Sequence, residues 1–488
     1  MVNINTPHII NDYSSGMIDT GSVSESLLPR NCVIKAVNCL FDSPRGSITG
    51  RAGSTLIGNN LSTQIYGLSN FRDAGTGTNH RLLATNGSGI TYYLSGATFT
   101  STLAGDTTGL KTRFVTYLDV IARLNGTDAA KSWDGSAAWI SGGGPLDVGN
   151  WPALTKFATV FNSRVYTAGS STYPSRLFYS SIPSSGLISW TSGNGYIDLN
   201  PDDGAGNLTG LVTNGTVLLA FKERSMYRWD GSSTFANKLI SVGTPSQESV
   251  VAHNSGWVYF FGTGLGGVGI YRTTGGYPQL ISRNITRWVN AIAGSAYANT
   301  AGYCDYDHYY LSVGSLTVDS QVYTNAWLVY TISLQAWHIE NRATSFRLFT
   351  EYIDSSSNVT IVGGDTSGNV QTINSGTTDN SVPISAECEL APVLITTRAR
   401  TKIIGHITAY STLFQGLQAL LKVDTGKYNM LGQIVDTEQK FTQIIGDAGM
   451  IRGKRFYPKI ISTNSQTGFQ FDGFELNEMV DEGWQSDI

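Results

Sequence analysis

The feature that most restricts the fold of this chain is a three-strand pattern that recurs through its middle. Its clearest copy lies at residues 208–231. There a half-apolar run, 208–213, leads into Asn214-Gly215, a dipeptide that accepts the positive φ values of a two-residue hairpin turn. The apolar run 216–221 and the aromatic-bearing run 225–229 follow, so the segment predicts three short antiparallel strands.

Further copies of this pattern are weaker, and they recur about every 40 to 50 residues, which is the period of four-stranded propeller blades. Their third strands are the most alike, because each carries an aromatic residue and runs into a small polar turn. The first strands are predicted at 65–71, 113–117, 157–161, 249–253, 301–304 and 346–352. The pattern predicts an all-β fold with a β-propeller of six or seven blades at residues 61–382. An ordinary pair of β-sandwiches with similar hairpins remains the alternative.

The two ends of the chain differ from this repeated region. Residues 1–60 predict an N-terminal arm with a strand at 33–41 and a second short strand before Arg51. Longer alternating strands fill residues 383–488 and predict a C-terminal β-sandwich to which the arm contributes. Within it, residues 417–421 fit a helix or a strand, and the strand is favoured. Residues 285–293 could form a short helix.

Composition limits the classes of function. Charged residues make up only 14% of the chain and glycine occurs 55 times, which favours β structure with many turns. The net charge of −4 argues against a protein that grips nucleic acid through clustered Lys and Arg, although a weakly acidic wall is compatible with DNA passing by. We expect ordinary reduced thiols, no signal peptide and no membrane span. The four cysteines are Cys32, Cys39, Cys304 and Cys388.

Motifs for catalysis or cofactor binding are incomplete. The glycine-rich segment 262–267 follows a predicted strand but continues into another strand, so it lacks the helix N-terminus that holds a pyrophosphate and predicts a hairpin. Residues 180–190 resemble a sialidase-type Asp box but lack its aspartate. Residues 198–204 could offer oxygens to calcium without the full ligand pattern. Residues 304–308 hold metal-capable side chains without a recognised ligand spacing.

Several aspartates could be paired as acid and base for sugar hydrolysis, but loops rich in Asp and Gly are better explained by turn formation. These residues are Asp198, Asp202, Asp203, Asp305 and Asp307. The sequence therefore predicts no catalytic residues, no metal site and no cofactor, and favours a protein that is not an enzyme.

Two segments carry a resemblance to a known family. Residues 27–58 contain Leu28-Pro29, Ala36-Val37-Asn38, Asp42, Gly46-Ser47-Ile48 and Arg51-Ala52-Gly53. This succession resembles the opening of tail nozzle, or packaged-DNA stabilisation, proteins of short-tailed bacteriophages, with Ala52-Gly53 where Pro-Gly is common. Near the other end, residues 452–456 followed by 473–476 are similar to the late strand pair of that family.

The resemblance implies a structural protein of the virion tail, assembled in the host cytoplasm. Such proteins form a homo-hexameric ring below the portal and adaptor proteins, extend and close the DNA channel, and take part in genome retention and ejection. Tail fibre or spike proteins attach outside, and double-stranded DNA passes without sequence recognition. No channel-lining residues are assigned. The candidate intersubunit cations are Arg30, Arg45, Arg51, Arg452, Lys454 and Arg455.

Two alternatives stay open beside this interpretation. The first is a propeller glycosidase that acts on host-surface polysaccharide. The second is a tail protein that binds a host-surface glycan or receptor.

Overall fold

The computed structural model describes most of the chain, in which strands account for 53% and helices for 5% of the residues. The described residues are 2–4, 8–42, 45–73, 80–200, 206–232, 236–354, 357–393, 402–404, 406–414, 417–433, 440–444, 451–462, 469–477 and 479–481. The protein is therefore mostly β, as predicted, and its strands are distributed over many small sheets.

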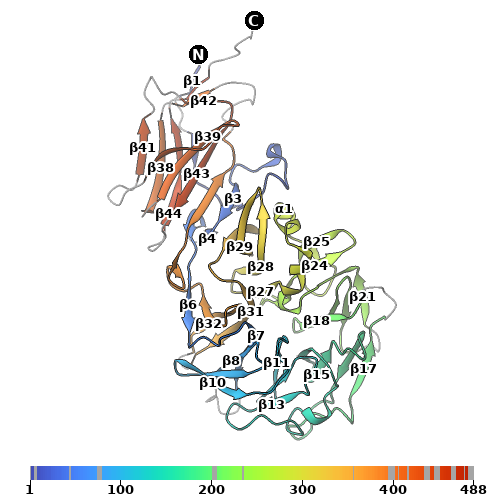
Figure 1. Cartoon of the computed structure of the whole chain (residues 1–488). Helices are drawn as coiled ribbons and strands as arrows, with labels where there is room; N and C mark the ends of the chain where they lie inside the picture. The colour runs from blue at the N-terminus through green and yellow to red at the C-terminus, as the bar shows by residue number, and fades with distance from the viewer. Residues whose placement is uncertain are drawn as a thin grey trace.

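The middle of the chain forms a succession of small antiparallel sheets in sequence order, which we call the repeat sheets (Figure 1). The first repeat sheet holds β7 (Ile65–Arg72), β8 (His80–Asn86), β9 (Thr91–Ser95) and β10 (Thr98–Leu103). The second holds β11 (Arg113–Tyr117), β12 (Val120–Leu124) and β13 (Lys131–Trp133). The third holds β14 (Phe157–Phe161), β15 (Arg164–Ala168), β16 (Arg176–Tyr179) and β17 (Gly195–Asp198).

The fourth repeat sheet holds β18 (Leu208–Thr213), β19 (Leu218–Lys222), β20 (Met226–Trp229) and β21 (Asn237–Ile240). The fifth holds β22 (Val242–Gly243), β23 (Val251–Ala252), β24 (Val258–Gly264), β25 (Gly267–Thr273) and β26 (Gln279–Leu280). The sixth begins with β27 (Ala301–Cys304), β28 (His308–Val318), β29 (Gln321–Thr331) and β30 (Ala336–Asn341). The seventh holds β31 (Phe346–Ile353), β32 (Val359–Asp365), β33 (Val370–Ile373), β6 (Ser54–Ile57), β34 (Thr378–Asp379) and β35 (Val382–Pro383).

The fourth repeat sheet shows how turn chemistry sets strand bounds. Gly215 has φ of 91°, but Asn214 has no positive φ, and the paired residues Thr213 and Leu218 enclose four residues, so the two-residue turn predicted at Asn214-Gly215 is wrong. The carboxamide oxygen of Asn214 then accepts hydrogen bonds from the backbone N–H groups of Thr216 and Val217, both at 3.1 Å. These two amides are therefore used by the turn, and β19 begins at Leu218 rather than at Thr216 as predicted.

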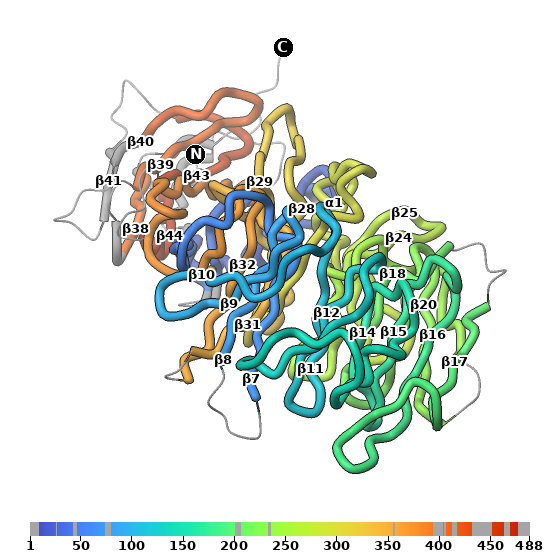
Figure 2. The backbone as a smooth tube through the Cα atoms, turned by 60° about the horizontal axis from the view of Figure 1, so that its bottom comes forward, coloured from blue at the N-terminus to red at the C-terminus, as the bar shows by residue number. Residues whose placement is uncertain are grey.

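Neighbouring repeat sheets contact one another through their first strands. The first strand of each sheet touches the first strand of the next, except that β23 makes these contacts in the fifth sheet, and β31 of the seventh sheet also packs on β7 of the first. A hydrophobic cluster lies between the seventh and first sheets, with Leu348 and Val362 packed against Ile65 and Leu82. Figure 2 shows the same neighbours, with β31 and β32 beside β7, β8 and β10.

The N-terminal arm is built into the sheets around it. β6 pairs antiparallel with β33, so the strand that precedes the first repeat sheet belongs to the seventh. Just before it, Gly53 lies so close to its neighbour that an added Cβ would sit 2.0 Å from the carbonyl oxygen of Thr378. Only glycine fits at this position without a backbone shift, which gives a physical reason for the Arg51-Ala52-Gly53 motif.

One strand of the arm joins the two halves of the molecule. β3 (Val33–Val37) pairs with β30 of the sixth repeat sheet on one side and with β36 (Ala386–Leu390) on the other. The sixth sheet thus continues into the C-terminal region as a nine-stranded sheet. Its further strands are β43 (Phe456–Ser462), β39 (Leu417–Val423) and β40 (Asn429–Gln433). The strand favoured for residues 417–421 is confirmed.

A second C-terminal sheet faces this one across a shared core that contains Phe456, Ile460, Phe471 and Phe474 (Figure 1). It holds β2 (His8–Ile10), β4 (Cys39–Asp42), β5 (Arg45–Gly50), β44 (Phe469–Asn477), β38 (His406–Phe414) and β41 (Lys440–Ile444). A small sheet near the termini holds β1 (Val2–Ile4), β45 (Met479–Asp481), β37 (Lys402–Ile404) and β42 (Ile451–Gly453).

Helices are short. The segment 285–293, whose sequence is compatible with a short helix, contains α1 (Thr286–Asn290). The 3-10 helices are Glu25–Leu27, Val148–Asn150, Gln247–Ser249, Arg283–Ile285 and Gly294–Asn299. Within the described residues, no helix is both long enough and apolar enough to cross a membrane. The four cysteines are buried and unpaired.

Candidate functional site

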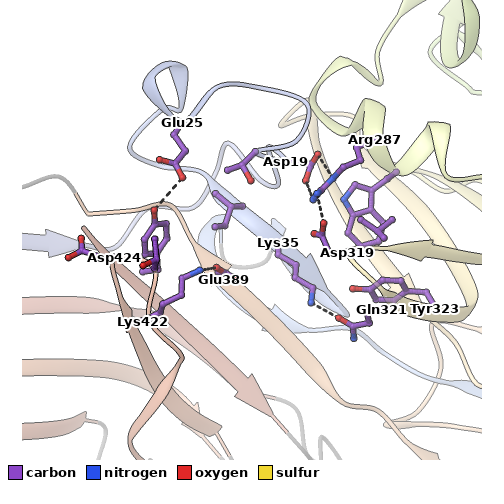
Figure 3. A pocket seen from close by; sticks show the side chains of 17 residues that line it. Asp19, Glu25, Lys35, Arg287, Asp319, Gln321, Tyr323, Glu389, Lys422 and Asp424 are labelled. Atoms are coloured by element: carbon purple, nitrogen blue, oxygen red, sulfur yellow. Dashed lines mark hydrogen bonds and ion pairs between the residues drawn. The ribbon is translucent and has the colours of Figure 1, made fainter. Parts of the chain in front are cut away.

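A charged groove of about 490 Å³ lies where the arm, the sixth repeat sheet and the C-terminal strands meet (Figure 3). We call it the junction groove. The arm contributes Asp19, Glu25 and Lys35 to its lining. α1 contributes Arg287, the β28–β29 hairpin contributes Asp319, Gln321 and Tyr323, and the C-terminal strands and their loop contribute Glu389, Lys422, Asp424 and Tyr457.

The wall formed by the repeat region is fixed by Arg287. Its guanidinium bonds to both carboxylate oxygens of the buried Asp19 and to Asp319 at 2.6 Å. Ser22 donates to Asp19 at 2.8 Å and accepts the backbone N–H of Arg287 at 3.0 Å. Burial opposes the charge of Arg287, yet Asp19 and Asp319 outweigh it and raise the pKa of the guanidinium. These contacts fasten the arm to α1.

Asp319 reaches this wall because of a two-residue turn. Asp319 and Ser320 have φ values of 51° and 62°, and they connect the paired residues Val318 and Gln321 at the tip of the β28–β29 hairpin. Positive φ at both central residues is the geometry of a type I′ turn, for which aspartate is a suitable first residue.

The opposite wall joins the arm to the C-terminal strands. Arg455 bonds to Glu25 at 2.7 Å, and the Tyr457 hydroxyl donates to the other oxygen of the same carboxylate at 3.2 Å. Asp424 accepts the backbone N–H groups of Lys454 and Arg455 at 3.0 and 2.9 Å. Glu25 and Asp424 therefore hold the segment that carries two of the predicted interface cations, Lys454 and Arg455.

The floor of the groove also consists of matched charges. Lys35 bonds to Glu387 at 2.9 Å and to the side-chain oxygen of Gln321 at 2.8 Å. Lys422 bonds to Glu389 at 3.1 Å and lies 4.3 Å from the centre of the Tyr457 ring. The charges of Lys35 and Lys422 are therefore compensated by partners within the chain.

The structure places the predicted interface cations in different environments. Arg30, Arg452 and Lys454 are exposed, and Arg455 is partly exposed at the edge of the junction groove. Arg45 begins β5, and its side chain lies outside the described part of the structure. These residues therefore do not form a single cluster around Arg51.

The prediction that Arg51 is an intersubunit cation is wrong, because the residue is buried within the subunit and only 4% exposed. Its guanidinium binds both carboxylate oxygens of Asp379, at 2.8 and 2.6 Å, and its Nε donates to Asn38 at 2.8 Å. Glu340 lies 4.0 Å from Arg51 and pairs with Arg342 at 2.6 Å. Although burial opposes ionisation, Arg342 holds the pKa of Glu340 below its ordinary value. Arg51 is thus an internal cation that locks the arm, not a surface contact.

The candidate hydrolytic aspartates serve local structure. Asp198 forms a bidentate pair with Arg176, and Asp305 accepts backbone N–H groups from Asp307 and His308, as a turn-forming residue does. Asp307 binds Ser333. Asp202 and Asp203 lie outside the described residues. Among the residues that the structure describes, no group of three or more His, Cys, Asp or Glu is arranged to hold a metal ion.

The predicted glycine-rich hairpin is confirmed, since β24 ends and β25 begins within residues 262–267. No helix follows it, so the segment lacks the positive helix end needed to hold a pyrophosphate.

A second cavity, of about 300 Å³, lies among the first strands of the repeat sheets. Glu248 reaches into it from the fifth sheet and pairs with Lys111 at 2.9 Å and Arg113 at 2.6 Å from the second. Burial by itself raises the pKa of Glu248, but Arg113 and Lys111 outweigh it and bring the pKa to about 2. Sequence reasoning missed this triad because Glu248 lies 137 and 135 residues from Lys111 and Arg113.

Comparisons with known proteins do not place the chain in a family. No protein-family model matches it, and no curated protein matches its sequence. The solved structures similar to it include the computationally designed Ika8 protein, a chain of the mitotic checkpoint complex, and Saccharomyces cerevisiae Sqt1.

The similarity to these structures is low. Ika8 is 10% identical with a TM-score of 0.39, over 66% of this chain and 99% of that chain. The checkpoint chain is 8% identical with a TM-score of 0.39, over 65% and 90% of the two chains. Sqt1 is 7% identical with a TM-score of 0.40, over 66% and 98%. Scores of this size carry no argument about function.

Proposed function

We propose that the protein is a structural component of a short phage tail, built from a seven-bladed β-propeller with an appended β-sandwich. Three observations support the propeller. The first strands of the repeat sheets contact one another in sequence order, and β31 returns to β7. Residues from the first strands of the first, second, third, sixth and seventh sheets line one cavity. The strand that precedes the first sheet completes the seventh.

The observation that carries the tail function is that the two segments of the family resemblance meet in space. β5, from residues 27–58, pairs with β44, which includes residues 473–476. Ser47 of the first segment donates to Asp472 beside the second at 3.1 Å. At the edge of the junction groove, Arg455 of the late segment binds Glu25, which lies just before the first. The resemblance therefore concerns one three-dimensional unit instead of two unrelated short stretches.

In this proposal the subunit forms a homo-hexameric ring below the portal and adaptor proteins in the virion tail. The ring extends and closes the DNA channel, takes part in genome retention and ejection, and bears fibre or spike proteins outside. A net charge of −4, with many cations paired inside the chain, fits a wall that DNA passes without adhering, because counterion release would be small.

The intersubunit cations of the proposal are Arg30, Arg45, Arg452, Lys454 and Arg455. Arg51 is removed from this set because its guanidinium is buried against Asp379. Arg452 on β42 and Lys454 directly after that strand have exposed side chains, so a second subunit can reach them.

Electron microscopy of virions tests the proposal. We expect six-fold rings at the tail, and we expect the double reversal R452E/K454E to prevent ring formation. The matched control is Arg228→Glu, which reverses an exposed cation on β20 of the fourth repeat sheet and should leave the rings intact. Tails without six-fold density for this chain would contradict the function. Rings that persist in R452E/K454E would contradict only the interface.

A further inference from the structure

A cleft of about 660 Å³ lies between the fifth, sixth and seventh repeat sheets, away from the junction groove. Its rim carries Tyr306, whose side chain is 94% exposed. An exposed tyrosine ring at the mouth of a cleft has both an apolar face and a hydroxyl group available to a ligand.

The backbone that presents Tyr306 is held firmly. Asp305 accepts the backbone N–H groups of Asp307 and His308 at 2.8 and 2.6 Å, and the Tyr310 hydroxyl donates to its other oxygen at 2.8 Å. The carbonyl oxygen of Tyr306 lies 3.2 Å from Nε2 of His253. Since a carbonyl only accepts, Nε2 carries the proton. The exposed ring is therefore mounted on an ordered loop.

The cleft is lined by a carboxylate and by hydroxyl groups that can form hydrogen bonds with a ligand. Glu351 presents an exposed carboxylate, and Tyr303 and Thr372 add hydroxyl groups. Burial, followed by the nearby Glu351 and Asp305, raises the pKa of the Tyr303 phenol, so this group stays an O–H donor at neutral pH. The described residues that line the cleft include no Lys or Arg, the side chains most used to bind phosphate.

We propose that this cleft binds a saccharide, with a sugar ring stacked on Tyr306 and its hydroxyl groups bonded to Glu351 and Tyr303. A pyranose presents a C–H face to an aromatic ring and several hydroxyls to a carboxylate, which matches an exposed ring beside a carboxylate and a phenol. The ordered loop lowers the entropic cost of binding, because the ring is already in place. The proposal goes beyond the tail function and does not depend on it.

The test is binding of the purified full chain to an array of oligosaccharides from bacterial capsules and lipopolysaccharides, followed by calorimetry on the best binder. We expect saturable binding that weakens about tenfold in Tyr306→Ala and by a similar factor in Glu351→Gln. The matched control is Tyr277→Ala, which removes another highly exposed tyrosine, 75% exposed and outside the cleft lining, and should bind as the unaltered chain does.

Three results would overturn the proposal. The first is that no oligosaccharide binds above background. The second is that the oligosaccharide binds equally well after Tyr306→Ala and Glu351→Gln. The third is that the cleft binds a quaternary ammonium probe, tetramethylammonium, through Tyr306 but no sugar, which would identify a cation site. None of these results bears on ring symmetry in virions, so the two proposals fail separately.

Discussion

Replacing Glu248 by glutamine is expected to destabilise the repeat sheets by about 3 kcal/mol at pH 7. The carboxylate crosses the cavity between the fifth and second sheets to Lys111 and Arg113, and its pKa falls from 4.5 to about 2. Each unit of a pKa shift corresponds to about 1.4 kcal/mol, and Glu248 is buried enough for its full shift to count. Glutamine keeps the size of the side chain and removes its charge.

The sign of the pH dependence follows from the lowered pKa. The contribution of Glu248 is fully present above pH 4.5, the ordinary value, and is lost as the pH falls towards 2. The difference between the unaltered chain and Glu248→Gln should therefore shrink from about 3 kcal/mol at pH 7 to about 1 kcal/mol at pH 3. Urea unfolding followed by tryptophan fluorescence at the two pH values measures both differences.

The control for this experiment is Asp198→Asn, which removes the partner of Arg176 at an exposed position. Its side chain is 51% exposed, so the loss should stay below about 1 kcal/mol. Equal stability of Glu248→Gln and the unaltered chain at pH 7 would refute the reasoning. If the difference in the free energy of unfolding between the two chains does not shrink at pH 3, the loss of stability comes from packing and not from charge.

Two further changes test how the arm is locked. Arg51→Met leaves the buried carboxylate of Asp379 without its bidentate partner and should cost about 3 to 5 kcal/mol, read from thermal unfolding; no change in melting temperature would refute this. Gly53→Ala forces a Cβ into a neighbouring carbonyl oxygen and should lower the yield of folded protein sharply. Gly276→Ala, where a Cβ meets open space, should leave the yield unchanged, and equal yields for both variants would contradict the steric argument.

Local elements of the fold could be predicted because their signals are local. The strands expected at 113–117, 157–161 and 301–304 have those bounds in the structure, since alternation and turn residues lie within a few positions of each strand. The strand expected at 249–253 is shorter, because residues 247–249 form a 3-10 helix instead. There the side chain of Gln247 bonds to the backbone of β18 in place of a strand.

The candidate sites were less predictable because their partners lie far apart in the sequence. Arg51 is 328 residues from Asp379, and Glu25 is 430 residues from Arg455. A single sequence carries no signal for such pairs, so a buried structural arginine and an exposed one look the same. The sequence also carries no signal for the exposure of Tyr306, because this exposure depends on the way three sheets meet at the cleft.

The shared strand β3 has a consequence for the order of synthesis. It leaves the ribosome early, but its partners β30 and β36 follow about 300 and 350 residues later. Contacts over such separations form slowly, because a long loop must close before they can be made. β3 therefore stays without these two partners until residues 336–341 and then residues 386–390 have been translated. A chain that ends before Glu389 would lack the C-terminal wall of the junction groove and would not present this surface to a neighbour.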